Sequence, residues 1–357
     1  MHLLKFISIA LFGVSFTLGQ DNNQQAPQGD SSKTITQLLT SDSSLNITGF
    51  LELITSDPGY APIISLLNST ESNFTAFIPN NKAVRALSIL YKSDARRQGN
   101  DDSGDYPPAN YTLLNMTAAE LVTYHVANGS YELTNFTWNS YPVPSLLNTP
   151  LDPSDNGLPI LITNNATAEE ITNSTWVEEN QDDLIYRPGN GVNFARVLYK
   201  DIAASNGRVN IIDNLLYPPQ SPTTVLSNIY ATRTLFNVVR NFPDLVETLN
   251  NGTNFTLLAP NNEALRDVDF GSLDNDTIKN IILTHVIPGT YYSYNISQAA
   301  VQNQGNFTVN AANSTPLPIY VNGSNILIND TASVVRTDAL FNNGVMHIID
   351  QLLMPSA

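Results

Sequence analysis

A nine-residue segment that occurs twice limits the possible folds of this chain more than any other feature. Residues 73–81 read NFTAFIPNN and residues 254–262 read NFTLLAPNN. Apolar residues recur at every second position in both copies, which is the period of a β-strand, and a proline then ends the strand. The asparagines that follow favour a turn and the N-cap of a short helix. The recurrence predicts one strand-to-helix unit that is used twice.

Two further segments repeat in the same order along the chain. Residues 121–126 (LVTYHV) match residues 281–286 (IILTHV), and residues 210–216 (NIIDNLL) match residues 347–353 (HIIDQLL). Repeats in a fixed order indicate duplicated domains. The 357 residues therefore divide into a first domain, residues 34–219, which carries polar insertions, and a second domain, residues 220–357, with the proline-rich linker at residues 218–222. The insertion between Ser88 and Met116 contains glycine, aspartate and a pair of prolines, which predicts a loop.

Two histidines lie at helical spacing on apolar faces, one in each copy. His125 follows Ala118, Leu121 and Val122 at helical spacing, and His285 follows three apolar residues at the same spacing. A histidine there could be a metal ligand or a general base, since it titrates near neutral pH. The apolar face instead favours a buried imidazole that bonds a loop or the main chain. The same interpretation applies to His347, which Asn210 replaces in the first copy, and we expect no metal or cofactor site.

The N-terminus has the pattern of a secretory signal peptide. A lysine precedes an apolar run that ends at small Gly19, which predicts a cleaved signal over residues 1–19. A membrane anchor would need a longer apolar span. Residues 20–33 are rich in polar residues and predict a disordered leader. No apolar stretch follows the last predicted strand, so we expect neither a transmembrane segment nor a lipid anchor.

Acceptor sequences for N-glycosylation are numerous, and cysteine is absent. The 17 Asn-x-Ser/Thr sites indicate a heavily glycosylated secretory product. The two that introduce the repeated strand, at Asn73 and Asn254, are weaker candidates than loop sites. The candidates are Asn46, Asn68, Asn73, Asn110, Asn115, Asn128, Asn135, Asn165, Asn173, Asn251, Asn254, Asn275, Asn295, Asn306, Asn313, Asn322 and Asn329.

The charge and the motif content narrow the class of function. A net charge of −16 argues against binding to nucleic acid and to acidic lipid surfaces. No nucleophile elbow, HExxH, Walker or dinucleotide-glycine pattern is found, so we expect no enzyme. Residues 152–157 are similar to the start of a calcium loop, but Thr163 stands where a bidentate glutamate belongs, which favours a plain turn. Acidic stretches at residues 100–105 and 178–183 could bind calcium weakly or pair carboxylates for glycoside cleavage, but solvated loops explain them as well.

With these motifs in hand, the chain resembles the fasciclin (FAS1) family twice over. The family's opening strand is matched at residues 75–79 and 256–260, and its Tyr-His pair at Tyr124 and His125 but only at Thr284 and His285 in the second copy. Its closing N-G-x-x-H-x-I-D stretch is matched at residues 343–350 and more loosely at residues 206–213. The copies together cover almost all of the expected mature chain.

The resemblance implies an α+β fold of two tandem FAS1 domains, each a twisted antiparallel, sandwich-like wedge beside a layer of helices. It also implies an extracellular role in adhesion or in matrix or wall organisation, with surface, wall or matrix proteins or glycans, or other copies of the chain, as partners. In some animal members an Asp-Ile pair before the closing motif is implicated in integrin recognition. Asp201 and Ile202 stand there in the first copy, and Asp338 and Ala339 in the second.

Three alternatives stay open at this point. Asp201 could cap or turn the chain before residues 206–207 instead of forming a contact. The protein could be a soluble resident of a vacuole or similar lumen, because a signal peptide specifies the route and not the destination. It could also carry a small ligand, or act as an enzyme, in a cleft between sheet and helices. The chain combines many acceptor sites with an absence of cysteine, and in this composition it is similar to fungal members of the family.

Overall fold

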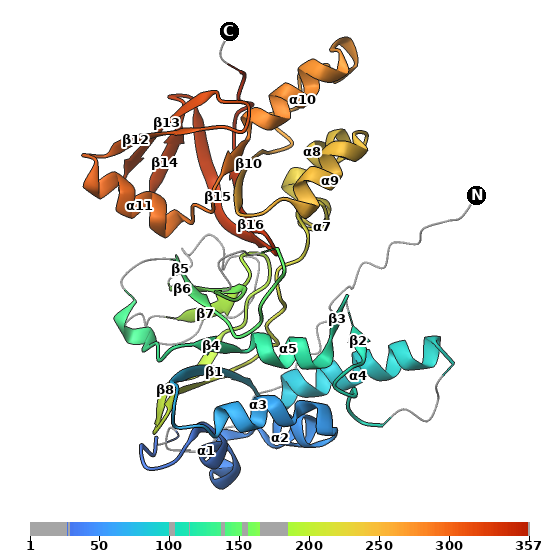
Figure 1. Cartoon of the computed structure of the whole chain (residues 1–357), viewed down its shortest axis with the longest axis vertical. Helices are drawn as coiled ribbons and strands as arrows, with labels where there is room; N and C mark the ends of the chain where they lie inside the picture. Colours follow the sequence, from blue (N-terminus) through green and yellow to red (C-terminus); the bar gives the residue numbers. More distant parts are fainter. Residues whose placement is uncertain are drawn as a thin grey trace, which may run out of the picture.

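The computed structural model describes residues 27, 29–99, 104–113, 115–136, 140–151, 156–164 and 185–355. They form two α+β domains that follow each other along the long axis of the molecule (Figure 1). The expected α+β class is therefore confirmed. The expected signal peptide, the acidic stretch at residues 178–183 and the sites Asn165 and Asn173 lie outside the described residues.

The first domain opens with a layer of helices, three of which begin at a polar cap, Thr34, Asn80 or Thr117. Capping boxes at Thr34 and Thr117 satisfy the first main-chain N–H groups of two of them. One helix is longer than expected, because the segment after Ser88 that was predicted as a loop continues it to Arg97. The helices are α1 (Ile35–Ser41), α2 (Thr48–Thr55), α3 (Ala61–Leu67), α4 (Asn81–Arg97) and α5 (Ala118–Tyr124), with short 3₁₀ turns η1 (Ser43–Leu45), η2 (Pro58–Tyr60) and η3 (Leu133–Asn135).

Two main sheets complete the first domain. One has the order β4-β1-β9-β8, and the other has the order β5-β6-β7. The repeated strand β1 pairs in parallel with β9, which departs from the expected antiparallel pattern. The strands are β1 (Phe74–Pro79), β2 (Thr112–Leu113), β3 (Met116–Thr117), β4 (Val126–Asn128), β5 (Ser140–Pro144), β6 (Pro159–Asn164), β7 (Tyr186–Gly189), β8 (Val197–Ala204) and β9 (Gly207–Ile212).

The second domain repeats this arrangement with one continuous sheet. Its order is β11-β10-β16-β15-β14-β13-β12, and β10 again pairs in parallel with β16. Residues 263–268, expected as a helix, form turns instead. The helices are α7 (Pro222–Asn228), α8 (Arg233–Val239), α9 (Pro243–Asn251), α10 (Asn275–Thr284) and α11 (Ser293–Gln302), with 3₁₀ turns η4 (Tyr230–Thr232) and η5 (Phe270–Ser272). The strands are β10 (Phe255–Pro260), β11 (Val286–Pro288), β12 (Asn306–Asn310), β13 (Pro316–Asn322), β14 (Asn325–Ile328), β15 (Ala332–Phe341) and β16 (Gly344–Ile349).

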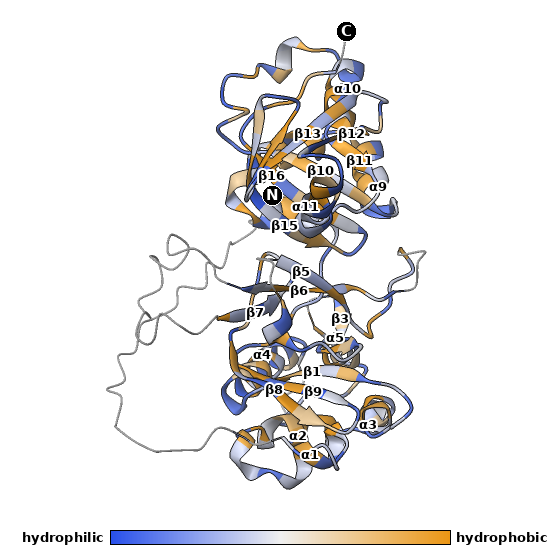
Figure 2. Ribbon diagram, turned by 90° about the vertical axis from the view of Figure 1, so that its left-hand side faces the viewer, coloured by the Kyte–Doolittle hydropathy of each residue, from blue (hydrophilic) through white to orange (hydrophobic). Residues whose placement is uncertain are grey.

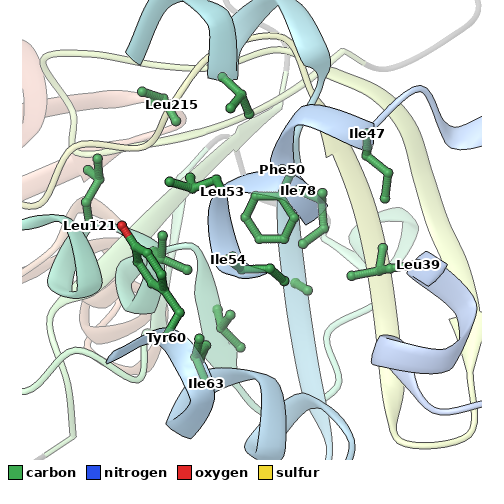
Figure 3. Packing of buried hydrophobic residues seen from close by; sticks show 14 of the residues in the cluster. Leu39, Ile47, Phe50, Leu53, Ile54, Tyr60, Ile63, Ile78, Leu121 and Leu215 are labelled. Atoms are coloured by element: carbon green, nitrogen blue, oxygen red, sulfur yellow. The ribbon is translucent and has the colours of Figure 1, made fainter. Parts of the chain in front are cut away.

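Each repeated strand is buried on both faces, although its sequence alternates. In β1, Phe74, Ala76 and Ile78 face the helices, where Phe50 and Leu53 of α2 pack in the same cluster (Figure 3). Phe77 faces the other way and joins a second cluster. Figure 2 shows hydrophobic colour on the central strands inside each domain. The helical layer thus covers one face of the central strands, as expected for this fold.

The end of the leader differs from the prediction. The main-chain N–H of Asp30 donates to the carbonyl of Ala203 (2.9 Å), and Ser205 donates to the carbonyl of Lys33 (2.7 Å). The linker makes the matching contact in the second domain, where Asn342 donates to the carbonyl of Gln220 (3.0 Å). Residues 30–33 are therefore ordered against β8 because they complete hydrogen bonds at its end, and they are not part of a disordered leader.

Candidate functional site

His125 connects the end of helix α5 to the segment after strand β9. Its Nδ1 lies 2.7 Å from the carbonyl oxygen of Leu121, and its Nε2 accepts a hydrogen bond from the main-chain N–H of Leu216 (2.9 Å). Because Nε2 accepts, the proton of the neutral ring is on Nδ1 and is donated to Leu121. Both ring nitrogens are therefore used within the fold.

His285 makes the same pair of contacts in the second domain. Its Nδ1 donates to the carbonyl of Ile281 (2.8 Å), and its Nε2 accepts from the N–H of Leu353 (3.0 Å). Burial lowers the pKa of His125 and His285 from 6.5 to about 4, because the charged imidazolium loses its hydration. Both rings are therefore neutral at physiological pH, and the geometry favours the buried structural role over a metal-ligand or general-base role.

The other half of the Tyr-His pair is also buried. The hydroxyl of Tyr124 donates to the carbonyl of Pro159 (2.7 Å) on strand β6, and burial raises the pKa of this phenol. Thr284 takes the same position in the second domain, where its hydroxyl donates to Asn280 (2.9 Å). The Thr284 hydroxyl also accepts from the Asn313 amide (2.8 Å), so the departure from the family's Tyr-His pair replaces the bond to strand β6 with one to the loop between β12 and β13.

The two aspartates at the family's contact position lie at equivalent bulges in strands β8 and β15. Asp201 has φ = 56° and Asp338 has φ = 58°, a left-handed conformation that aspartate adopts more readily than most residues other than glycine. The N–H of Asp338 donates to Nδ1 of His347 (3.2 Å), whose Nε2 donates to the carbonyl of Tyr291 (2.8 Å). The N–H of Asp201 donates to Oδ1 of Asn210 (2.9 Å). The main-chain N–H of each aspartate is therefore held by the residue at the histidine position of the closing motif, His347 or Asn210.

The Asp201 carboxylate is engaged within its own domain. It accepts hydrogen bonds from the N–H groups of Leu133 (2.8 Å) and Thr134 (3.3 Å), the start of the 3₁₀ turn η3. Ile202 is only 4% exposed and packs in the first core. Asp201 therefore lies within strand β8 and its carboxylate caps η3, instead of turning the chain before residues 206–207. The Ile202 side chain offers no surface to a partner in this conformation.

The Asp338 carboxylate instead joins the two domains. It accepts hydrogen bonds from the main-chain N–H of Ser293 (2.8 Å), from the Ser293 hydroxyl, and from the hydroxyl of Ser140 in the first domain (2.9 Å). It is 1% exposed. A buried carboxylate needs such donors to replace water. The sequence pointed to Asp338 only as a departure from the Asp-Ile pair, and its neighbour across the domains is separated from it by almost 200 residues.

A loop of the first domain inserts against strand β15 and strengthens this contact. The carbonyl of Gly191 accepts from Nη2 of Arg336 (2.6 Å), and the carbonyl of Asn190 accepts from the N–H of Leu340 (2.9 Å). Gly191 has φ = 79°, and a Cβ atom there would lie 1.7 Å from the carbonyl oxygen of Asp338. Only glycine permits this close approach. Pattern reasoning gave no signal for these residues.

Apolar side chains from both domains close the interface. Leu161 of β6 packs with Leu340 and Val345 of the second domain, and the rings of Tyr141 and Tyr294 meet edge to face with centroids 4.7 Å apart. Aromatic pairs of this geometry stabilise contacts beyond the area that they bury. The two domains therefore form a docked pair with a mixed apolar and hydrogen-bonded interface.

Most glycosylation candidates that the structure describes are accessible. Twelve are exposed: Asn46, Asn68, Asn73, Asn110, Asn115, Asn128, Asn135, Asn251, Asn275, Asn295, Asn306 and Asn322. Asn254, Asn313 and Asn329 are half-buried, and the Asn313 amide already donates to Asn280 and Thr284. Thr75 and Thr256 are buried and donate to the carbonyls of Gly129 and Gly289 (2.8 Å each). The sequons at Asn73 and Asn254 thus contain threonines that the fold itself needs.

Among the residues that the structure describes, no group of three or more His, Cys, Asp or Glu side chains is arranged to hold a metal ion. No helix in the described part of the chain is long and apolar enough to cross a membrane.

The fold defines a protein built from two related α+β modules that dock through a buried carboxylate. The family model described as Fasciclin domain matches residues 46–218 and 231–355, so the chain belongs to the fasciclin domain family. The repeated modules are the two fasciclin domains expected from the three sequence motifs.

Several proteins are similar to this chain over part of their length. Human periostin is 30% identical over 168 residues, which are 46% of this chain and 20% of periostin. The transforming growth factor-beta-induced protein ig-h3 of Oryctolagus cuniculus is 29% identical over 194 residues, 51% of this chain and 27% of that protein. A fasciclin-like arabinogalactan protein, CTB11 of Cercospora beticola, is 26% identical over 177 residues, 48% and 44% of the two chains. The chain thus matches less than half the length of each of these relatives.

A solved structure of a FAS1 domain pair from the insect cell adhesion molecule fasciclin I aligns with 88% of this chain and 98% of its own. The sequence identity is 17% and the TM-score is 0.37.

Proposed function

We propose that the chain is a secreted, N-glycosylated binding protein that acts at the cell surface, wall or matrix through its docked pair of fasciclin domains. Membership of the family supports this proposal, since the resemblance implies adhesive or matrix roles. The apolar N-terminal run and the exposed acceptor asparagines support a secretory route.

The observation that carries the proposal is the interface built on Asp338. It fixes the two domains to each other through Ser140, Arg336 and the Leu161 cluster. Two sites held at a fixed separation raise each other's effective concentration, so weak contacts by each domain add to useful binding. The docked pair of domains, and not the Asp201 position alone, is then the unit that binds a partner.

The small-ligand or enzymatic alternative gains no support from the described residues. The space between the helices and the first sheet is filled by side chains of the first core, among them Phe50, Tyr60 and Leu121 (Figure 3). His125 and His285 both use their ring nitrogens for main-chain hydrogen bonds. We therefore do not propose catalysis.

Expression of the tagged full-length chain in a eukaryotic secretory host tests the route. We expect the protein in the medium and on the wall or surface fraction, and in forms that a glycosidase shifts on a gel. Recovery only from a vacuolar or similar lumen would replace the surface assignment with the lumenal alternative. Unshifted protein that stays in the cytosol would contradict secretion.

Binding of the purified chain to surface, wall and matrix fractions tests the mechanism. We expect Tyr141→Ala, which weakens the domain interface, to bind less than the wild type, because the domains no longer hold a fixed separation. Tyr230→Ala is the matched control, since the Tyr230 ring is exposed and contacts Arg233 of its own domain. Binding by the wild type no stronger than that of serum albumin would contradict the adhesive role.

A further inference from the structure

The part of the second domain's sheet around β12, β13 and β14 has an uncharged outer face. Strands β12, β13 and β14 and residues 332–335 of β15 contain no charged residue. Alternate residues such as Val309, Ile319 and Ile328 point into the core, so their neighbours point outward. The outward set includes Asn306, Thr308, Pro318, Tyr320, Leu327, Ser333 and Val335, of which Tyr320 is 38% and Val335 is 56% exposed.

Protein covers the corresponding face of the first domain. The inward pair Val143 and Ile160 of β5 and β6 corresponds to Val309 and Leu317 of β12 and β13. By the same register Ser140 corresponds to Asn306. Ser140 and its neighbour Leu161 dock on the second domain. The repeated module therefore buries this face in one copy and exposes it in the other.

Asn306 lies directly opposite the exposed aromatic ring of this face. Asn306 and Tyr320 are register partners on the antiparallel strands β12 and β13. Directly opposed residues point to the same side of a sheet, with their Cβ atoms about 5 Å apart. Asn306 is exposed and begins the acceptor sequence Asn-Phe-Thr, so a sugar attached to its amide would start within reach of the Tyr320 ring.

We propose that an N-linked glycan on Asn306 covers this outer face, with its first N-acetylglucosamine packed against Tyr320. A pyranose ring presents C–H groups on one face, which suit an aromatic ring, while its hydroxyls stay in water. The saccharide is neutral, like the strip of outward side chains that it would cross. The inference rests on the secretory route proposed above, and it specifies what one modification does.

The position of β12 gives the glycan a second use. β12 is the terminal strand of its sheet, and its sequence contains neither proline nor a charged residue, two common protections of sheet edges. A bulky glycan on Asn306 supplies the missing obstacle to pairing with another chain. Asn322 is the matched control site, because it lies on the same face but opposite Asn325 and not opposite an aromatic ring.

The test compares full-length protein from a secretory host with Asn306→Gln, Thr308→Ala and Asn322→Gln. Thr308→Ala removes the acceptor sequence and leaves Asn306 unchanged. Glycopeptide mass spectrometry measures occupancy, hydroxyl-radical footprinting measures exposure of Tyr320, and light scattering measures the oligomeric state. We expect an occupied Asn306 and, in both variants that remove its glycan, severalfold higher labelling of Tyr320 and greater self-association. Asn322→Gln should change neither.

The outcomes separate the two proposals. Glycans at other sites but none on Asn306 would overturn this inference alone, whereas an absence of glycans at every site would overturn the secretory route as well. An occupied Asn306 whose removal leaves Tyr320 labelling unchanged would also overturn the inference. So would a glycosylated wild-type dimer that protects Tyr320, because a second copy would then cover the face.

Discussion

The hydroxyl of Ser140 in the first domain donates a hydrogen bond of 2.9 Å to the carboxylate of Asp338 in the second. The same carboxylate accepts two hydrogen bonds from Ser293 in its own domain. The turn that begins α11 and the contact between the domains therefore depend on one buried side chain. The carboxylate of the equivalent Asp201 accepts hydrogen bonds from Leu133 and Thr134 at the start of η3, within its own domain.

Removal of the interdomain hydrogen bond should cost less than removal of the carboxylate. We expect Ser140→Ala to lower the free energy of unfolding by about 1 kcal/mol, and Asp338→Ala by about 3 kcal/mol, because the latter leaves several buried donors without an acceptor. Urea denaturation measures both. Asp201→Ala is the control, since it should weaken the first domain without changing the effect of Ser140→Ala. Equal stability of Ser140→Ala and the wild type would contradict the role of the bond.

The buried histidines should make the fold sensitive to acid. Burial holds the pKa of His125 and His285 at about 4, against 6.5 in the unfolded chain. Between these values the unfolded chain binds protons that the folded chain does not, so stability falls as the pH falls from 6.5 to 4. Each histidine contributes a loss of up to about 3 kcal/mol. Urea denaturation between pH 7.5 and 4 should show a smaller loss in His285→Gln than in the wild type, and an identical loss would contradict this account.

The glycines that open β9 and β16 should not tolerate a side chain. A Cβ atom on Gly207 would lie 1.8 Å from the carbonyl oxygen of Phe74, and one on Gly344 would lie 2.0 Å from that of Phe255. These are main-chain atoms of the central strands, so they cannot move aside. We expect Gly344→Ala to cost more than about 3 kcal/mol and to reduce secretion sharply. Gly104→Ala, at a site with open space, should match the wild type in thermal melting.

His347 and Asn210, which accept hydrogen bonds from the N–H groups of Asp338 and Asp201, should differ in how much they stabilise their domains. Nε2 of His347 donates to the carbonyl of Tyr291, whereas the buried Nδ2 of Asn210 has no hydrogen-bond partner. We expect His347→Asn to destabilise the protein by about 1 to 3 kcal/mol, because asparagine is too short to reach Tyr291. Asn210→His should cost less than its reciprocal or stabilise the first domain. A larger loss from Asn210→His, measured by urea denaturation, would contradict this explanation.

The sequence predicted the parts of the fold that depend on local pattern. The helix that ends at His125 and the strand of residues 74–79 are both observed. The prediction of a loop directly after Ser88 is wrong, because the polar composition of this segment suits an exposed helix as well as a loop. In the structure the Asp201 carboxylate caps η3. A contact role for the family's Asp-Ile position therefore could not be assigned from sequence similarity alone.

The repeated motifs by themselves determined that this chain consists of two fasciclin domains, because strand period, capping residues and buried histidines are encoded over a few neighbouring residues. Only the tertiary structure decided how the domains meet and which faces stay open. Ser140 and Asp338, or Gly191 and Arg336, are distant in the chain, and their hydrogen bonds exist only after both domains have folded. The exposure of Tyr320 opposite Asn306 likewise depends on strand register, which no single segment specifies.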